Sequence, residues 1–299
     1  MVRRWLPANK FAVTNGDCAV VLVVGADGAI GSRLIHRLAS SHQRVVGTTR
    51  RAITKFGQIY LDLAGEIDYS SLPSCQAVVL CAGVTSIARC RLEPNLAKLI
   101  NVDNTVRLAR FFLEAGSHVV FLSSNSVFDG KHANSPAGAQ PSPITEYGYQ
   151  KAAAESQMMA VKGALTIVRF GKVITPTMPL FHEWIRDLRA NKFIYPFSDY
   201  RIAPISASFA IEVLLRVLSA RSLGVVQASA TVDISYAEAA FYLARSMGFG
   251  EYLIKPALSS EAGIRYTPDN TTLEPAKLFE LGLQPPQPER AFDELLLNL

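Results

Sequence analysis

Val21-Leu-Val-Val-Gly25-Ala-Asp-Gly28-Ala-Ile-Gly31 is the stretch that decides the fold, because it joins two kinds of apolar pattern through three glycines. Before the glycines, residues 19–24 are apolar throughout, which predicts a short buried β-strand. After them, apolar residues recur at helical spacing across residues 29–40, as in a helix that covers a sheet. The stretch therefore predicts a strand, a tight turn and a helix in direct succession.

The spacing of the glycines, GxxGxxG, suits a loop that holds the pyrophosphate of a dinucleotide. The first glycine permits the turn, the second lets the backbone approach a phosphate, and the third lets helix and strand pack closely. The helix start adds free N–H groups and the positive end of the helix dipole. A turn that binds nothing is the alternative, but the preceding buried strand favours the dinucleotide. The predicted cofactor contacts are Gly25, Asp27, Gly28, Ala29, Ile30 and Gly31.

Short apolar runs and helical patterns alternate through the first two-thirds of the chain. Strands are predicted over residues 44–48, 77–81, 119–123 and 165–170, and helices over 97–114 and 147–161. This alternation is typical of an α/β protein whose parallel sheet carries helices on both faces. Right-handed crossovers then make the expected fold class a doubly wound parallel sheet, the Rossmann fold.

Beyond Gly171 prolines interrupt the pattern, and helices are predicted over residues 181–190, 209–220 and 236–247. This part is expected to form a smaller C-terminal substrate-binding lobe. The predicted organisation is an N-terminal extension at 1–18, a Rossmann domain at 19–170 and a mainly substrate-binding lobe at 171–299. From that lobe, about 205–235 is expected to return to the Rossmann domain.

Composition and charge exclude several other classes of protein. The chain of 299 residues has a net charge of +5, but its basic residues are scattered, so nucleic acid is not an expected partner. No apolar stretch approaches the roughly 20 residues of a membrane span, and the basic N-terminus lacks the apolar core of a secretory signal. The four cysteines and five histidines lack metal-site spacings, so no metal is expected. A cytoplasmic location is the default expectation.

The end of the second predicted strand indicates which dinucleotide is bound. It reads Val46-Gly-Thr-Thr-Arg50-Arg51, without the carboxylate that would accept hydrogen bonds from a ribose 2′-hydroxyl. Two guanidinium groups suit a 2′-phosphate, which arginine can bind through paired hydrogen bonds. Arg50 and Arg51 therefore favour NADP(H) over NAD(H), a pair of solvated surface charges being the alternative.

Tyr147-Gly-Tyr-Gln-Lys151 places a phenol and an ammonium group one helical turn apart on one face. The ammonium is expected to lower the pKa of the Tyr147 phenol, which could then exchange a proton with a carbonyl or alcohol oxygen as hydride moves. The strand over 119–123 ends at Ser124, at the edge where doubly wound sheets bind ligands. Ser124 could hydrogen-bond the oxygen that Tyr147 protonates.

Three stretches carry a family resemblance. Ser124-Asn-Ser-Val-Phe-Asp-Gly resembles an STDYVFDG stretch, Tyr147 to Glu155 resembles a YGxxKxxxE helix, and Cys90 to Asn101 resembles an ExxPxxAxxxN helix. Together they are similar to the extended short-chain dehydrogenase/reductase family, most closely to its dTDP-4-dehydrorhamnose reductases. The resemblance extends from about Val21 to Leu297.

The resemblance implies roles for individual residues. The catalytic set would be Ser124, Tyr147, Lys151 and Asn101, with the asparagine supporting the active site. Further cofactor contacts would come from Asp62, Leu63, Cys81, Ala82 and Gly83, the first two near the adenine. Substrate contacts are expected from Ser124, Asn125, Ser126, Arg201 and Arg265.

The leading hypothesis is an NADPH-dependent reductase of the keto group on a nucleotide-linked 4-keto-6-deoxy sugar. Dehydratases of the same superfamily carry Thr-Asp-Glu where this chain has Ser124-Asn125-Ser126, so elimination of water is disfavoured. The run Asp199-Tyr-Arg-Ile-Ala-Pro204-Ile205 departs from the family's Asp-Gln-x-Gly-x-Pro-Thr, which leaves the sugar open. An epimerase and a non-catalytic, reductase-like regulatory subunit are the alternatives, and a homodimer is compatible with the sequence.

Overall fold

A computed structural model describes residues 20–52, 57–264 and 266–297, so the extension at 1–18 and Arg265 lie outside the described residues. Its larger part is built on a seven-stranded sheet in the order β10-β6-β5-β4-β1-β2-β3, with every pair of neighbours parallel. The strands are β1 (Val21–Val24), β2 (Val45–Thr49), β3 (Gln58–Tyr60), β4 (Ala77–Leu80), β5 (His118–Ser124), β6 (Leu165–Phe170) and β10 (Gly224–Ala228). The predicted fold class, a doubly wound parallel sheet, is confirmed.

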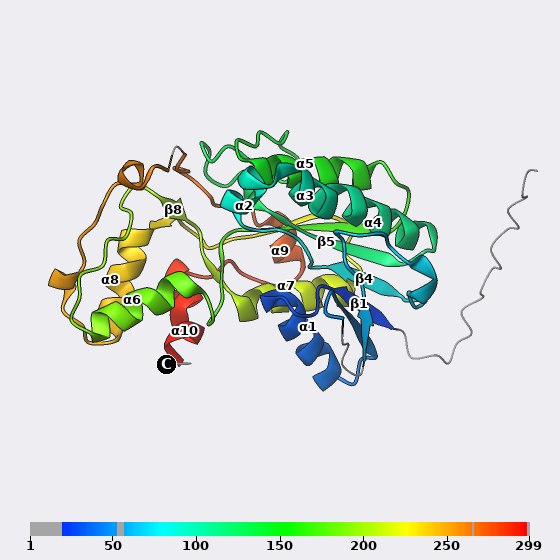
Figure 1. Ribbon diagram of the computed structural model, residues 1–299, viewed down its shortest axis with the longest axis horizontal. Coiled ribbons are helices and arrows are strands. Elements are labelled where there is room, and N and C mark those ends of the chain that lie inside the picture. The colour runs from blue at the N-terminus through cyan, green and yellow to red at the C-terminus, as the bar shows by residue number, and fades with distance from the viewer. Residues whose placement is uncertain (1–19, 53–56, 265, 298–299) are drawn as a thin grey trace, which may run out of the picture.

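Helices cover both faces of this sheet (Figure 1). On one face α1 (Ala29–Ser40) packs beside α7 (Ala207–Ala220), and their apolar sides share a core with β1 and β6. On the other face lie α4 (Thr105–Glu114) and α5 (Glu146–Met159), whose core contains Phe112, Phe121 and Met158. Residues 205–235 thus contribute α7 and β10 to the larger part, beside α9 (Ala276–Glu280).

The strand order places the ligand-binding edge. The chain runs outward from β1 in both directions, through β2 and β3 on one side and through β4, β5, β6 and β10 on the other. In such sheets the crevice for ligands lies beyond the carboxyl ends of the strands, where the order reverses. Here that point is between β1 and β4, beside the glycine loop.

One long predicted helix is interrupted. Residues 97–114 were expected to form a continuous helix, but the structure has α3 (Pro94–Lys98), a π-helical turn η2 (Leu99–Asn104) and only then α4. The prediction was wrong because periodicity does not register the hydrogen bonds of Asn101 and Asn104, whose side chains turn to loops beyond the helix. Turns of this kind often lie at functional sites.

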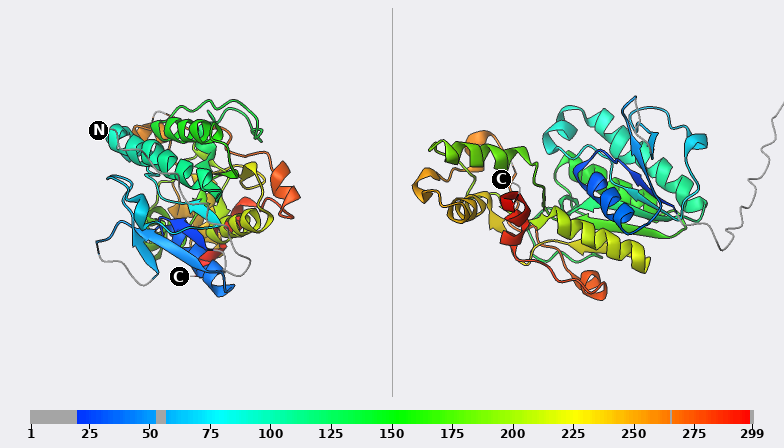
Figure 2. Two further views of the ribbon diagram at one scale, coloured as in Figure 1. Left: turned by 90° about the vertical axis from the view of Figure 1, so that its right-hand side faces the viewer. Right: turned by 90° about the horizontal axis from the view of Figure 1, so that it is seen from below.

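The smaller lobe lies at the carboxyl edge of the large sheet, at the left of Figure 1 and again at the left of the right-hand view in Figure 2. Its core joins three helices around Phe181, Trp184 and Phe292. They are α6 (Pro179–Arg189), α8 (Tyr236–Ser246) and α10 (Asp293–Leu297). Two small sheets join the lobe to the large part: β8 (Arg201–Ile202) with β11 (Ile234–Ser235), and β7 (Val173–Ile174) with β9 (Ile205–Ser206).

The remaining helical segments are short. They are α2 (Ile87–Leu92), η1 (Tyr69–Ser71), η3 (Asn125–Val127), η4 (Glu251–Leu253), η5 (Ser259–Ala262) and η6 (Pro288–Phe292). None of the helices in the described ranges has the length and apolarity that a membrane crossing requires.

Candidate active site

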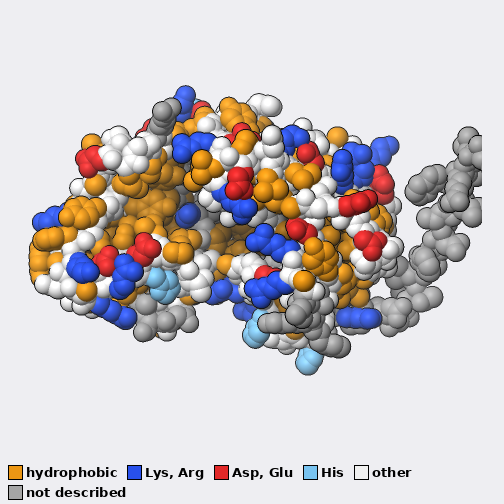
Figure 3. Space-filling view, in the orientation of Figure 1, with side chains coloured by type: hydrophobic (Ala, Val, Ile, Leu, Met, Phe, Trp, Pro, Cys, Tyr) orange, Lys and Arg blue, Asp and Glu red, His pale blue; other side chains and the backbone are white. Residues whose placement is uncertain are grey.

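A cavity of about 500 Å³ lies between the carboxyl edge of the large sheet and the smaller lobe. Figure 3 shows the molecule hollowed there, with hydrophobic side chains on the walls. The glycine loop, the ends of β4, β5 and β6, and the start of α5 supply one side; residues around β8 and α8 supply the other. Most of the residues predicted separately from the sequence therefore share one cavity.

The glycine loop packs as a dinucleotide loop must. Gly25 has a φ of +91°, and a side chain there would come within 2.9 Å of the Ala82 backbone. A side chain on Gly31 would overlap the carbonyl oxygen of Gly25, so the helix approaches the turn this closely only without one. Gly28 is the N-cap of α1 and no side chain caps that helix, which leaves its first N–H groups to a ligand. Gly28, Ala29, Ile30 and Gly31 line the cavity.

The predicted arginines lie where β2 ends, beside the loop. Arg51 forms an ion pair with Asp27, with 3.6 Å between Nε and Oδ2, and its side chain is 65% exposed. Asp27 also accepts a hydrogen bond from the Thr49 hydroxyl. Arg50 is exposed. A carboxylate thus lies among the groups expected to meet a 2′-phosphate.

Asn101 stands behind the cavity wall rather than on it. Its Oδ1 accepts from the Val84 N–H at 2.7 Å, and its Nδ2 donates to the Val84 carbonyl at 2.9 Å and to Gln150 Oε1 at 2.8 Å. These bonds tie the strand end Cys81–Gly83, which lines the cavity, to helix α5. Asn101 can act on the reaction only by positioning these elements.

Asp62 and Leu63 follow β3 outside this cavity. The Asp62 carboxylate accepts from the Ala64 N–H at 2.9 Å, and the Leu63 carbonyl accepts from Asn104 Nδ2 at 2.9 Å. Their predicted contact with the adenine stays a prediction.

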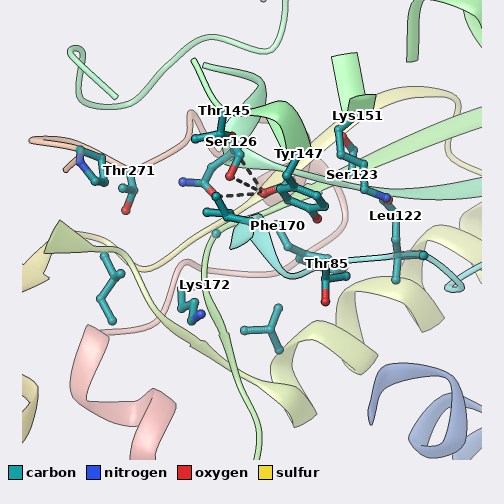
Figure 4. Close-up of a pocket in the computed structure, with 18 of the residues that line it drawn as sticks. Thr85, Leu122, Ser123, Ser126, Thr145, Tyr147, Lys151, Phe170, Lys172 and Thr271 are labelled. Carbon is teal, nitrogen blue, oxygen red and sulfur yellow. Dashed lines mark hydrogen bonds between the residues drawn. The ribbon is translucent and has the colours of Figure 1, made fainter. Parts of the chain in front are cut away.

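The predicted serine, Ser124, forms a side-chain hydrogen bond with Tyr147 at the end of β5. Figure 4 shows Tyr147 there beside Ser126. Ser124 Oγ donates toward Asn125 Oδ1 and Ser126 Oγ, each at 3.2 Å, and accepts from the Ser126 N–H at 3.1 Å. Tyr147 lies one residue into α5, which Thr145 caps by accepting from the Gly148 N–H. A side chain on Gly148 would overlap the Ser126 carbonyl oxygen, so glycine there lets α5 approach the serine loop.

Lys151 is buried beneath the tyrosine. Its Nζ donates to the Leu122 carbonyl at 2.7 Å and lies 4.5 Å from the centre of the Phe121 ring and 5.9 Å from that of Tyr147. The lysine is 5% exposed. It therefore sits between the end of β5 and the tyrosine, as the predicted pair requires.

The protonation states differ from the expectation. Burial raises the pKa of Tyr147 to about 12, opposed in part by its hydrogen bond with the Ser124 side chain. Burial lowers the pKa of Lys151 to about 8, opposed by the negative charge of Glu155. The prediction that Lys151 lowers the tyrosine pKa was wrong for this state, because the loss of solvent raises the pKa of Tyr147 more than its hydrogen bond with Ser124 lowers it.

A buried ion pair holds the far side of α5. Arg169, on β6, donates to both carboxylate oxygens of Glu155, the shortest bond being 2.7 Å, and the two side chains are 2% and 0% exposed. The guanidinium also donates to the Ala137 carbonyl and to Gln227 Oε1, and lies over the Phe128 ring. This network fixes α5, and with it the catalytic pair, against the sheet.

The substrate side of the cavity contains one predicted cation and one that the sequence analysis missed. Arg201 lines the cavity and donates from Nη2 to the Asp233 carbonyl at 2.7 Å. Lys172, two residues beyond β6, also lines it and is labelled in Figure 4. The only signal for Lys172 in the sequence is a charge between two strands, Phe170-Gly-Lys-Val, at the carboxyl edge where ligands bind.

Comparison with known proteins identifies the family. A model of the RmlD substrate binding domain matches residues 19–298. The chain belongs to this family. The resemblance to dTDP-4-dehydrorhamnose reductases is thereby confirmed.

Two curated relatives are similar in sequence to this RmlD-family chain. A probable low-salt glycan biosynthesis reductase, Agl14, of Haloferax volcanii is 25% identical over 210 residues, which is 66% of this chain and 70% of that protein. Methionine adenosyltransferase 2 subunit beta of Rattus norvegicus is 25% identical over 191 residues, 63% of this chain. The match spans 54% of that subunit, about half of its length.

Solved structures of related fold hold nicotinamide cofactors. The dTDP-4-dehydrorhamnose reductase of Bacillus anthracis str. Ames, in complex with NADP, has a TM-score of 0.83 at 19% identity, over 94% of this chain and 99% of that one. MoeE5 in complex with UDP-glucose and NAD has a TM-score of 0.78 at 23% identity, over 93% and 98%. At these identities the likeness establishes the fold of the RmlD-family chain.

Proposed function

We propose that this RmlD-family chain catalyses the NADPH-dependent reduction of a keto group on a nucleotide-linked deoxy sugar. The observation that carries the proposal is the shared cavity, which joins the uncapped start of α1 to Ser124, Tyr147 and Lys151 and then to the smaller lobe. A cofactor on the glycine loop and a second, elongated ligand from the smaller lobe would meet at the end of β5, where the serine and tyrosine lie.

The described residues fit a nicotinamide dinucleotide. The glycine loop accommodates a phosphate at the helix start, and the buried Ser123 hydroxyl lines the cavity without a hydrogen-bond partner among the described residues. The loop and the strand end at Cys81–Gly83 would hold the cofactor, and Arg50 and Arg51 would bind the 2′-phosphate of NADP(H). When bound, the reduced cofactor supplies the hydride.

The protonation state of the tyrosine supports reduction. A phenol with a pKa of about 12 keeps its proton at neutral pH, and the protonated form is the one that can donate to a carbonyl oxygen as negative charge develops there. The Ser124 hydroxyl, within the same group of hydrogen bonds, would orient that oxygen. While it is protonated, the Lys151 ammonium would place a positive charge beside the tyrosine.

The direct test measures oxidation of NADPH and NADH by the purified chain with nucleotide-linked 4-keto-6-deoxy sugars, in the thymidine and the uridine series. We expect faster turnover with NADPH, and a loss of about a hundredfold or more in Tyr147→Phe with its fold retained. Tyr149→Phe is the matched control, because Tyr149 lies on the same helix but is exposed. Tightly bound cofactor with no net oxidation on any keto sugar would contradict the reductase and support an epimerase.

A second candidate function is a non-catalytic subunit that binds another protein. The similarity to methionine adenosyltransferase 2 subunit beta favours it. The two functions differ in their need for the tyrosine: a binding subunit would keep its biological effect in Tyr147→Phe, whereas a reductase would lose it. The expected cytoplasmic location and homodimer stay predictions.

A further inference from the structure

The cavity carries charge of one sign. Among the described residues that line it, Lys151, Lys172 and Arg201 are cationic and none is Asp or Glu. Lys151 and Arg201 each donate to a backbone carbonyl, of Leu122 and Asp233. The Lys172 ammonium has no hydrogen bond or ion pair with any residue in the described part of the chain. Lys172 is therefore the cation of this cavity that the protein itself compensates least.

The two substrate-side cations lie on different walls. Phe170 pairs in register with Ser124 on the neighbouring strand, and Lys172 follows two residues later, which places it at the reacting end of the cavity. Figure 4 shows Lys172 and Tyr147 around the same space. Arg201 belongs to β8, which pairs with β11 in the smaller lobe. A nucleotide-linked sugar that reaches Ser124 would thus meet Arg201 with its outer part and Lys172 with its sugar.

The surroundings of Lys172 favour an anionic ligand group. Burial lowers the pKa of this lysine, and no nearby carboxylate opposes that effect. A partly buried cation without a partner is unfavourable unless a bound group supplies the opposite charge. The diphosphate of a nucleotide sugar can be held by Arg201, so a cation just beyond the end of β6, in the same cavity as Ser124, calls for a second anionic group, carried by the sugar.

We propose that Lys172 binds a carboxylate on the sugar, so that the preferred substrate is a nucleotide-linked 4-keto-hexuronic acid. The inference rests on the proposed function for the nucleotide-sugar cavity. The reaction would still be the reduction of a keto group. The substrate would carry a carboxylate at the carbon where a 6-deoxy sugar carries a methyl group.

The test compares ligands that differ only at that carbon. Binding of UDP-glucuronic acid and UDP-glucose, and of the thymidine diphosphate pair, is measured by calorimetry on the full chain with NADP⁺ present. The variants are Lys172→Gln, Lys172→Arg and Arg201→Gln, with Lys192→Gln as the control because Lys192 is exposed and outside the cavity. We expect the wild type to bind the uronic acid about tenfold or more tightly in at least one series.

Lys172→Gln should bring the ratio of affinities for the uronic acid and the neutral sugar close to one, and Lys172→Arg should keep most of it. Arg201→Gln should weaken the binding of both nucleotide sugars equally. A preference near one in the wild type would overturn the inference, as would no binding in either series. Equal weakening of both members by Lys172→Gln would also overturn it, since Lys172 would then serve the diphosphate. Uronic-acid preference without oxidation of NADPH on any keto sugar, uronic or neutral, would leave the inference standing and refute the reductase.

Discussion

Replacing Lys151 by methionine is expected to stabilise the fold while abolishing activity. The pKa of this lysine is lowered from 10.5 to about 8, which corresponds to about 3 kcal/mol of unfavourable burial at pH 7. Methionine of similar length removes that burden but also the hydrogen bond to the Leu122 carbonyl, whose loss costs about 1–2 kcal/mol. The variant should therefore gain about 1–2 kcal/mol in free energy of unfolding.

The pH dependence identifies the cause of that gain. Between pH 8 and 10.5 the unfolded wild type binds more protons at this lysine than the folded form does, so the stability of the wild type rises with pH across that window. The advantage of the methionine variant should fall by about 1.4 kcal/mol per pH unit there and disappear by about pH 10.

Urea unfolding followed by circular dichroism from pH 7 to 10 measures this difference, with Lys162→Met as an exposed control that should change little. A Lys151→Met variant that is less stable than the wild type at pH 7, or whose stability difference does not vary with pH, would contradict this prediction.

Three further perturbations follow from the same contacts. Asp27→Asn removes the negative charge that pairs with Arg51, so the ratio of kcat/KM for NADPH to that for NADH should rise several-fold; a fall would argue against a 2′-phosphate there. Glu155→Ala should lower the free energy of unfolding by about 3–5 kcal/mol, because it leaves Arg169 buried without its partner, and the double change Glu155→Met with Arg169→Leu should restore much of it in urea titrations. Gly148→Ala forces α5 away from the serine loop, so steady-state assays should show kcat reduced at least tenfold with the fold retained.

The first strand, turn and helix could be predicted because all of their determinants are local. The apolar run before Gly25 and the helical spacing after Gly31 can each be recognised within a short stretch of sequence. The structure has β1 and α1 on either side of the turn. The place of Ser124 was predictable for a related reason: parallel strands bring their carboxyl ends to one edge, where ligands bind. Tyr147 lies near that edge because it starts the helix that follows β5 along the chain.

What could not be predicted depends on the degree of burial. Spacing correctly places Tyr147 and Lys151 one turn apart, but it does not tell how much solvent surrounds them, and burial reverses the expected direction of the tyrosine pKa. Lys172 was missed for the same reason, since a single charge in an apolar run is ordinary until the fold shows that its neighbours form a cavity wall. The π-helical turn at Asn101 likewise depends on bonds to loops far along the chain.

Lys151 and Glu155 show how this chain keeps a charge where burial opposes it. One turn apart on α5, they differ in compensation: Glu155 accepts hydrogen bonds from both Nε and Nη2 of Arg169, while Lys151 donates to one carbonyl. The negative charge of Glu155 raises the pKa of Lys151 and so limits the effect of burial. The buried pair therefore contributes to the site as well as to the fold, because the charge of Glu155 is the largest of the effects that oppose the lowering of the Lys151 pKa by burial.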